Sequence, residues 1–310
     1  MLIYVIGAGA IGSLFGGLLA NAGYNIVLVG RKEQVKAINQ NGLKITGLTN
    51  LTVNVKAYEH PPGEEPDLII LATKAYSTKD ALSCVRDIIG NKTWILGIQN
   101  GLGNEDLALQ YTSNVLGGIT TNGAALLDWG TVQWSGKGET IVGVYPKGKH
   151  KFAHKVAEVF TNAGILTKVN ENIIGVKWAK AIVNSAINPL GALLGVKNGF
   201  LVENDYARSI LIEIAEESYR VAKKLGIEFE FDPVELTIRT AEMTKDNYNS
   251  MLQDLQRRKR TEIDYINGKI VEFASKAGTD AKLNELFWKL IKAKEEIALN
   301  STYKHKGGLI

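Results

Sequence analysis

The stretch Leu2-Ile3-Tyr4-Val5-Ile6-Gly7-Ala8-Gly9-Ala10-Ile11-Gly12 joins a short apolar run to three glycines with the spacing GxGxxG. A helical pattern follows over 13–20, and 26–29 is again apolar. The glycines therefore lie at a strand-to-helix turn in a βαβ unit of about thirty residues, which is typical of a dinucleotide-binding site. In such a turn Gly7 permits the tight bend, Gly9 lets the backbone approach a pyrophosphate, and Gly12 lets the helix pack on the strand.

The residues after the second strand indicate which dinucleotide binds. An acidic residue there would hold a ribose 2′-hydroxyl and repel a 2′-phosphate, but this chain has Gly30-Arg31-Lys32. Arg31 can form a forked, charge-assisted pair with a phosphate. The sequence therefore favours NADP(H) over NAD(H); the alternative is an arginine that is merely exposed in a loop.

Two further apolar runs end in polar residues that are candidates for ligand contacts. Residues 67–73 lead to Lys74, and residues 94–98 lead to Gln99-Asn100-Gly101. The carboxyl ends of parallel strands line the ligand crevice of an open α/β sheet, so we expect Lys74 and Asn100 to contact cofactor or substrate. Asn-Gly is also a common turn dipeptide, which gives Asn100 a purely structural alternative.

The second half of the chain has a helical pattern. From about residue 172 the hydrophobic period changes from two to 3.6 residues. We therefore predict an α/β Rossmann-type dinucleotide-binding domain over 1–170 and an all-α domain over 171–310. The first helix of the second domain is expected to kink or end at Pro189. Later helices are expected at about 205–225, 233–244, 249–277 and 284–299.

Lys180, Asn184 and Asn188 recur at every fourth residue of the mostly apolar or small segment 176–189. On a helix this spacing puts them along one stripe, about 6 Å apart in rise. A buried lysine and two buried amides are costly unless a polar group faces them. A solvated stripe is the alternative, but such stripes usually carry more charge. The pattern favours a cleft wall that faces a small polar ligand.

Composition excludes several classes of protein. The chain has 310 residues, 45% of them hydrophobic, which is enough for two domains, and its net charge is only +4. The basic run Arg257-Arg258-Lys259-Arg260 has no interleaved aromatic residues, so we expect no nucleic-acid partner. A single cysteine, Cys84, and the lack of a membrane-length apolar run or signal peptide favour a cytoplasmic protein without membrane contact. No metal is expected, because no ligand spacing links the histidines His60, His150, His154 and His305.

These motifs together resemble the ketopantoate reductases (2-dehydropantoate 2-reductases) over essentially the whole chain. The late block is the specific part of the resemblance, because generic Rossmann enzymes do not carry it, and the order and spacing of all the motifs agree. The matching stretches are Gly7–Gly12, Thr73-Lys74-Ala75, Gln99-Asn100-Gly101, Lys180–Pro189, Asn198-Gly199, and the late block Ser250–Asp254 with Thr261–Gly268.

The resemblance implies NADPH-dependent reduction of 2-dehydropantoate to (R)-pantoate, a step toward pantothenate and coenzyme A. It implies that Lys180 is the general acid and that Glu262 is its acidic catalytic partner. A cationic donor aimed at the ketone oxygen would stabilise and protonate the developing alkoxide. The implied substrate contacts are Asn100, Asn184, Asn188, Asn198 and Ser250. The expected cofactor contacts are Gly7, Ala8, Gly9, Ala10, Ile11, Gly12, Arg31, Lys74, Asn100 and Glu262.

Some alternatives stay open at this point. A related NADPH-dependent 2-oxo acid or imine reductase, or a non-catalytic NADPH-binding sensor, would share much of the pattern, and both a monomer and a homodimer are possible. Ser250 and Glu262 are twelve residues apart, which on one straight helix separates them by about 18 Å. We therefore expect Ser250 to lie in the turn that starts the helix and Glu262 to face Lys180. The alternative is a glutamate exposed on a charged helix.

Overall fold

The computed structural model describes residues 1–300, so His305 lies outside the described residues. The chain divides into two compact units, Met1–Lys177 and Trp178–Ile310. The boundary between the units lies inside helix α6 (Ile173–Leu194), whereas the predicted boundary at 170/171 precedes this helix. Each unit has its own architecture.

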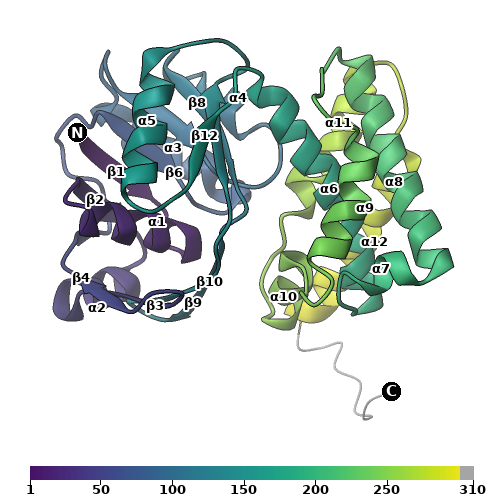
Figure 1. The fold of residues 1–310 in the computed structure, drawn as a ribbon, viewed down its shortest axis with the longest axis horizontal. Helices are drawn as coiled ribbons and strands as arrows, with labels where there is room; N and C mark the ends of the chain where they lie inside the picture. The colour runs from purple at the N-terminus through teal and green to yellow at the C-terminus, as the bar shows by residue number, and fades with distance from the viewer. Residues whose placement is uncertain (301–310) are drawn as a thin grey trace. The chain divides into compact units, whose positions relative to one another are not determined.

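An eight-stranded sheet is the framework of the first unit (Figure 1). Its strand order is β12-β11-β8-β7-β6-β1-β2-β5, and every neighbouring pair is parallel except β8 with β11. Strand β1 lies between β2 and β6, which is why its apolar run is almost entirely buried. The strands are β1 Leu2–Ile6, β2 Asn25–Val29, β5 Lys56–Tyr58, β6 Leu68–Leu71, β7 Trp94–Gly97, β8 Val115–Thr120, β11 Thr140–Val144 and β12 Thr167–Val169.

A second, four-stranded sheet has the order β4-β3-β10-β9. Strands β3 and β4 are antiparallel and follow each other in the chain. Strands β3 and β10 are parallel although they are distant in sequence. The bounds are β3 Leu43–Gly47, β4 Leu51–Val53, β9 Gly123–Asp128 and β10 Thr131–Gly136.

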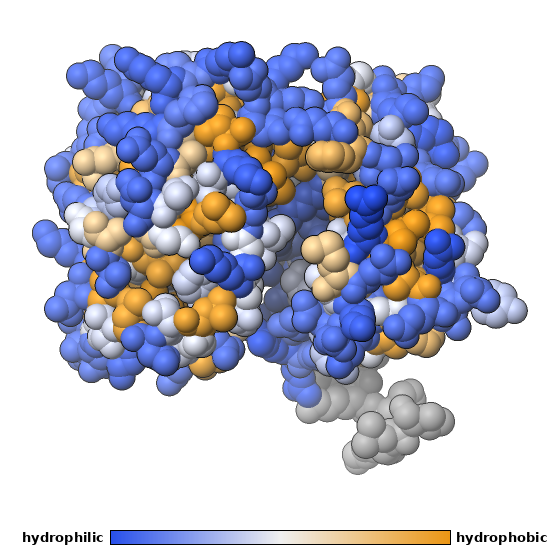
Figure 2. All heavy atoms as spheres, in the orientation of Figure 1, coloured by the Kyte–Doolittle hydropathy of each residue, from blue (hydrophilic) through white to orange (hydrophobic). Residues whose placement is uncertain are grey.

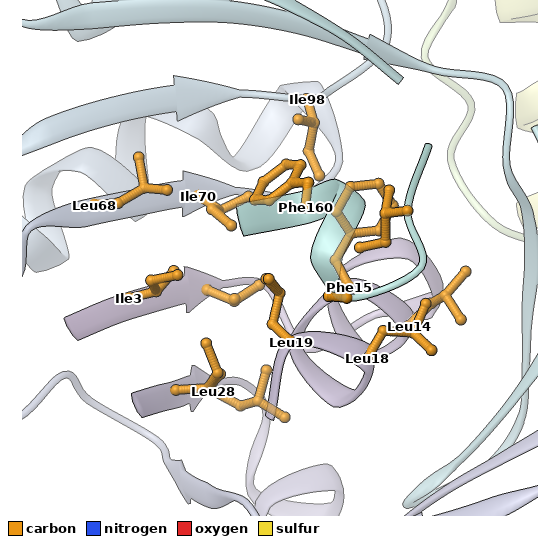
Figure 3. Packing of buried hydrophobic residues seen from close by; sticks show 14 of the residues in the cluster. Ile3, Leu14, Phe15, Leu18, Leu19, Leu28, Leu68, Ile70, Ile98 and Phe160 are labelled. Carbon is orange, nitrogen blue, oxygen red and sulfur yellow. The ribbon is translucent and has the colours of Figure 1, made fainter. Parts of the chain in front are cut away.

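Helices cover the sheets of the first unit and complete its core (Figure 3). Phe15 of α1 and Phe160 of α5 meet edge to face, with ring centroids 5.6 Å apart. Their rings pack with Ile3, Ile70 and other apolar side chains in one buried cluster. This packing fixes the start of α1, which follows the glycine turn, against the sheet. The helices are α1 Ala10–Asn21, α2 Lys32–Asn41, α3 Thr78–Val85, α4 Asn104–Ala108 and α5 Lys151–Asn162.

The second unit is all helical over the residues that the structure describes. Glu217 of α8 is buried and accepts hydrogen bonds from the backbone amides of Leu283 (3.0 Å) and Asn284 (2.8 Å), so it caps the start of α12. The elements are α6 Ile173–Leu194, α7 Phe200–Glu203, α8 Asp205–Lys224, α9 Pro233–Met243, α10 Ser250–Gln256, the 3₁₀ turn η3 Ile263–Tyr265, α11 Asn267–Lys276 and α12 Lys282–Leu299.

The predicted continuous helix over 249–277 is wrong. Helix α10 ends at Gln256, Arg258 adopts a left-handed backbone conformation (φ 54°), and α11 begins only at Asn267. The intervening Thr261 is held by buried Glu295, which accepts from its backbone amide (2.7 Å) and its hydroxyl (2.5 Å). A carboxylate 34 residues away thus satisfies the backbone where the helix stops.

Pro189 does not end α6, which continues to Leu194. A proline inside a helix removes the amide that would bond the carbonyl four residues earlier, here that of Ser185. The side chain of Asn267 donates to this carbonyl instead, at 2.9 Å. The helix can therefore pass through the proline without leaving a buried carbonyl unsatisfied.

A buried ion pair joins the start of α6 to α4 within the first unit. Lys177 Nζ pairs with Glu105 Oε1 of α4, and the two side chains are 2% and 1% exposed. Burial raises the pKa of Glu105 above its ordinary value, although Lys177 acts in the opposite direction. The second oxygen, Oε2, has no hydrogen-bond partner among the described residues.

The ion pair predicts an asymmetric response to substitution. Glu105→Ala leaves the lysine charge buried alone and should lower the free energy of unfolding by about 3–5 kcal/mol. The double variant Glu105→Leu/Lys177→Met removes both charges and should lose far less stability, or gain some. Denaturant unfolding followed by circular dichroism at neutral pH measures both. A double variant as unstable as Glu105→Ala would contradict this account.

Candidate active site

The glycine turn of the first unit has two crowded glycines and one open one. A Cβ on Gly7, whose φ is +106°, would lie 2.6 Å from the backbone nitrogen of Thr73. A Cβ on Gly12 would lie 2.0 Å from the carbonyl oxygen of Gly7. A Cβ on Gly9 would meet no described atom within 4 Å. The first two positions need glycine for packing, and Gly9 leaves open space next to the first turn of α1, where a ligand can approach the backbone.

The turn is tied to the end of β2, where the basic residues follow. The carbonyl of Val29 accepts from the amides of Gly7 (2.9 Å) and Ala8 (3.0 Å). Arg31 comes next in the chain, is exposed, and is the residue that precedes α2. A cation at the end of β2, together with an open helix N-terminus, fits the dinucleotide with a 2′-phosphate that the sequence predicts.

Lys74 and Asn100 follow neighbouring parallel strands, β6 and β7, and both are half-buried. Gln99, to which the sequence analysis gave no role, links the two strand ends. Its Nε2 donates to the carbonyl (3.0 Å) and contacts the hydroxyl (2.8 Å) of Thr73. Its Oε1 is buried without a partner among the described residues. The sequence feature that could have identified Gln99 is an amide directly after an apolar strand. Gln99 supports the loops that carry Lys74 and Asn100.

In the second unit, Lys180, Asn184 and Asn188 lie four residues apart on α6, as the sequence predicts. Lys180 and Asn184 are half-buried, and Asn188 is buried. The sequence analysis missed Lys177, three residues before Lys180, because it considered only the stripe with a spacing of four. The helix therefore carries two lysines in different environments: Lys177 is fully buried in an ion pair, and Lys180 is partly exposed.

Asn198 lies in the turn between α6 and α7, and Ser250 lies at the start of α10. Asn198 is buried, and its Nδ2 donates to Thr244 Oγ1 at 2.9 Å. Its Oδ1 is buried and has no partner within residues 1–300. Ser250 is exposed and is the first residue of α10, directly after Asn249, whose side chain caps the helix through the amide of Leu252 (3.0 Å). Ser250 therefore starts a helix, as expected.

Glu262 is only 6% exposed, which excludes the alternative of a glutamate on a solvated helix face. It lies in the break between α10 and α11, immediately before the η3 turn. The neighbouring Thr261 is anchored by Glu295, so the backbone at Glu262 is held from one side. A buried carboxylate needs a polar partner. The pairing of Glu262 with Lys180 stays a prediction.

Among residues 1–300, no group of three or more histidine, cysteine, aspartate or glutamate side chains is arranged to hold a metal ion. Within the same range, no helix is long and apolar enough to cross a membrane.

A glycine turn on a parallel sheet, joined to a helical unit with a lysine-bearing helix, defines the class of two-domain dinucleotide-dependent oxidoreductases. Residues 3–147 match the family model of ketopantoate reductase PanE/ApbA, and residues 172–295 match the model of its C-terminal part. The chain therefore belongs to the ketopantoate reductase family. The resemblance and the fold class inferred from the sequence are confirmed.

Similar proteins match almost the whole chain. A Pyrococcus horikoshii protein named 2-dehydropantoate 2-reductase is 55% identical, over 96% of this chain and 98% of its own. One of the same name from Archaeoglobus fulgidus is 38% identical, over 94% and 97%.

Two solved structures extend the comparison. The PanE/ApbA family ketopantoate reductase of Ralstonia eutropha JMP134 has a TM-score of 0.90 at 28% identity, over 97% of this chain and 100% of its own. A D-mandelate dehydrogenase, solved as a ternary structure with NADH and anilino(oxo)acetate, has a TM-score of 0.89 at 30% identity, over 96% and 99%.

Proposed function

We propose that this chain is an NADPH-dependent reductase that converts 2-dehydropantoate to (R)-pantoate, on the route to pantothenate and coenzyme A. The observation that carries the proposal is the 55% identity, over 96% of the chain, with a relative named 2-dehydropantoate 2-reductase. The lysine and amides on α6 supply the chemistry that such a reduction needs.

The first unit is the NADP(H)-binding part of the proposal, corresponding to the domain expected over 1–170. Bound NADPH would supply the hydride. The open backbone at Gly9 and the amides that start α1 receive the pyrophosphate, and Arg31 binds the 2′-phosphate. The proposed cofactor contacts are Gly7, Ala8, Gly9, Ala10, Ile11, Gly12, Arg31, Lys74, Asn100 and Glu262.

The second unit carries the proton donor and most of the substrate contacts, corresponding to the domain expected over 171–310. Lys180 is the general acid: its ammonium stabilises and protonates the oxygen of the reduced ketone. Buried Glu262 favours the charged form of that lysine. The unpartnered Oδ1 of Asn198 can accept a hydrogen bond from a substrate hydroxyl. Substrate contacts are proposed for Asn100, Asn184, Asn188, Asn198 and Ser250.

A second candidate is the reduction of a different 2-oxo acid with the same residues. The D-mandelate dehydrogenase structure favours it, because a protein of another name and with NADH bound shares this fold at 30% identity. Arg31 supports NADPH over NADH for the present chain.

We also propose a cytoplasmic enzyme that acts as a monomer or homodimer without a nucleic-acid partner. The net charge of +4 is small, and Figure 2 shows hydrophilic side chains interspersed with apolar ones over the visible face. Nucleic-acid binding usually requires a concentrated basic patch.

The cofactor assignment predicts a change of preference in Arg31→Asp. Loss of a charge-assisted phosphate pair and gain of a repelling carboxylate should weaken NADPH binding by about ten- to a hundredfold, with little effect on NADH. Initial rates with each cofactor give the two kcat/KM values, and Lys224→Asp, at the end of α8, is the control. Equal kcat/KM values for NADPH and NADH in the unmodified protein would contradict the assignment.

The assignment of the general acid predicts that Lys180→Ala loses turnover and not cofactor binding. The rate of 2-dehydropantoate reduction should fall by about 10²–10⁴-fold, because the developing oxyanion loses its proton donor. Single-turnover NADPH oxidation measures the rate, and fluorescence titration measures the NADPH dissociation constant. Lys224→Ala should match the unmodified protein in both. A near-normal rate in Lys180→Ala would move the role to another group, with Lys74 the next candidate.

A further inference from the structure

The carbonyl of Ser185 in α6 is bonded by a side chain from another helix. Pro189 has no amide hydrogen, so it cannot donate the usual helical hydrogen bond to the carbonyl four residues earlier. Asn267, the first residue of α11, is fully buried and donates from Nδ2 to this carbonyl at 2.9 Å. The hydrogen bond that proline removes is thus replaced across 82 residues of sequence.

The surroundings of Asn267 fix which end of its amide faces α6. Its Nδ2 also donates to Asn284 Oδ1 (3.0 Å), and Asn284 in turn donates to buried Glu217 (2.9 Å) and Ser218 (3.0 Å). Its own Oδ1 is buried and has no partner among the described residues. The side-chain NH2 group of Asn267 therefore makes the hydrogen bonds, and its role at this position is that of a donor.

Ser185 lies directly after Asn184 and three residues before Asn188, two of the proposed substrate contacts. A proline ring pushes the carbonyl of residue i−4 aside, so the direction of that carbonyl sets the local bend of the helix. A buried donor that holds the carbonyl also holds the bend. Asn184 and Asn188 lie on either side of the residue whose carbonyl is held in this way.

We propose that Asn267 is a positioning residue of the active site: it donates the hydrogen bond that Pro189 cannot, and so aligns Asn184 and Asn188 for the substrate. This inference rests on the proposed reduction of 2-dehydropantoate. It assigns Asn267 no contact with substrate or cofactor.

The test is a double-mutant cycle of Asn267→Leu with Pro189→Ala. In the native background, Asn267→Leu should raise KM for 2-dehydropantoate about tenfold or more, because misplaced binding groups are costly, while the NADPH dissociation constant stays unchanged. Alanine at 189 restores an amide within α6. In the Pro189→Ala background, Asn267→Leu should therefore change KM by less than about threefold, which is a coupling between the two sites.

The controls separate positioning from stability. A variant that is merely less stable loses active protein, which lowers kcat and leaves KM unchanged. Thr237→Val removes a fully buried hydroxyl of the same unit that bonds within α9, so its effect should be equal in both backgrounds. Should Asn267→Leu fail to fold, recovery of a folded protein by Pro189→Ala supports the proposal, and an unfolded double variant overturns it.

Two results overturn the inference: an equal rise in KM in both backgrounds, or a fall in kcat with KM unchanged. Failure of the proposed function is a separate outcome, because it appears as no reduction of 2-dehydropantoate by the unmodified protein. In that case the melting temperatures of the unmodified protein, the two single variants and the double variant replace KM as the readout. The same coupling between Asn267 and Pro189 is expected, and additive changes in melting temperature would contradict the proposal.

Discussion

The need to satisfy polar groups along one apolar helix shapes much of this structure. Helix α6 places two lysines, two asparagines and a proline among buried hydrophobic residues. Each of these would be costly in isolation, because a buried charge needs a partner and a proline leaves a carbonyl unsatisfied. Glu105 forms an ion pair with Lys177, and Asn267 donates a hydrogen bond to the Ser185 carbonyl that Pro189 cannot reach with an amide.

The two lysines of α6 illustrate how environment divides roles. Lys177 is locked against Glu105 with almost no exposure, so its ammonium has no route to a ligand. Lys180 lies three residues further on and is half-buried, so it can meet a ligand while feeling a lower dielectric than water. The proposed catalytic role of Lys180 therefore rests on access as well as on position in the family motif.

Sequence patterns predict the framework because its signals are local. The glycine spacing after β1 and the change of period before α6 each involve neighbouring residues, and each has the predicted structure. The same reasoning placed Lys180, Asn184 and Asn188 on one helix. These features need no knowledge of distant contacts.

The missed features all depend on partners far away in sequence. The helix expected over 249–277 is interrupted because Glu295 holds Thr261, and no periodicity in that segment reveals this. The partner of Lys177 lies 72 residues earlier, in a short helix after a turn. Long-range hydrogen bonds override local propensity here.

The most direct test of the central claim, that this chain reduces 2-dehydropantoate with NADPH, is the consumption of NADPH by the purified protein. Absorbance is followed with 2-dehydropantoate, with 2-oxoisovalerate, and without an acid. The account predicts rapid oxidation with 2-dehydropantoate, a much lower kcat/KM with 2-oxoisovalerate, which lacks the hydroxyl that Asn198 would bind, and none without an acid. Equal kcat/KM for the two acids, or no oxidation with either, would contradict it.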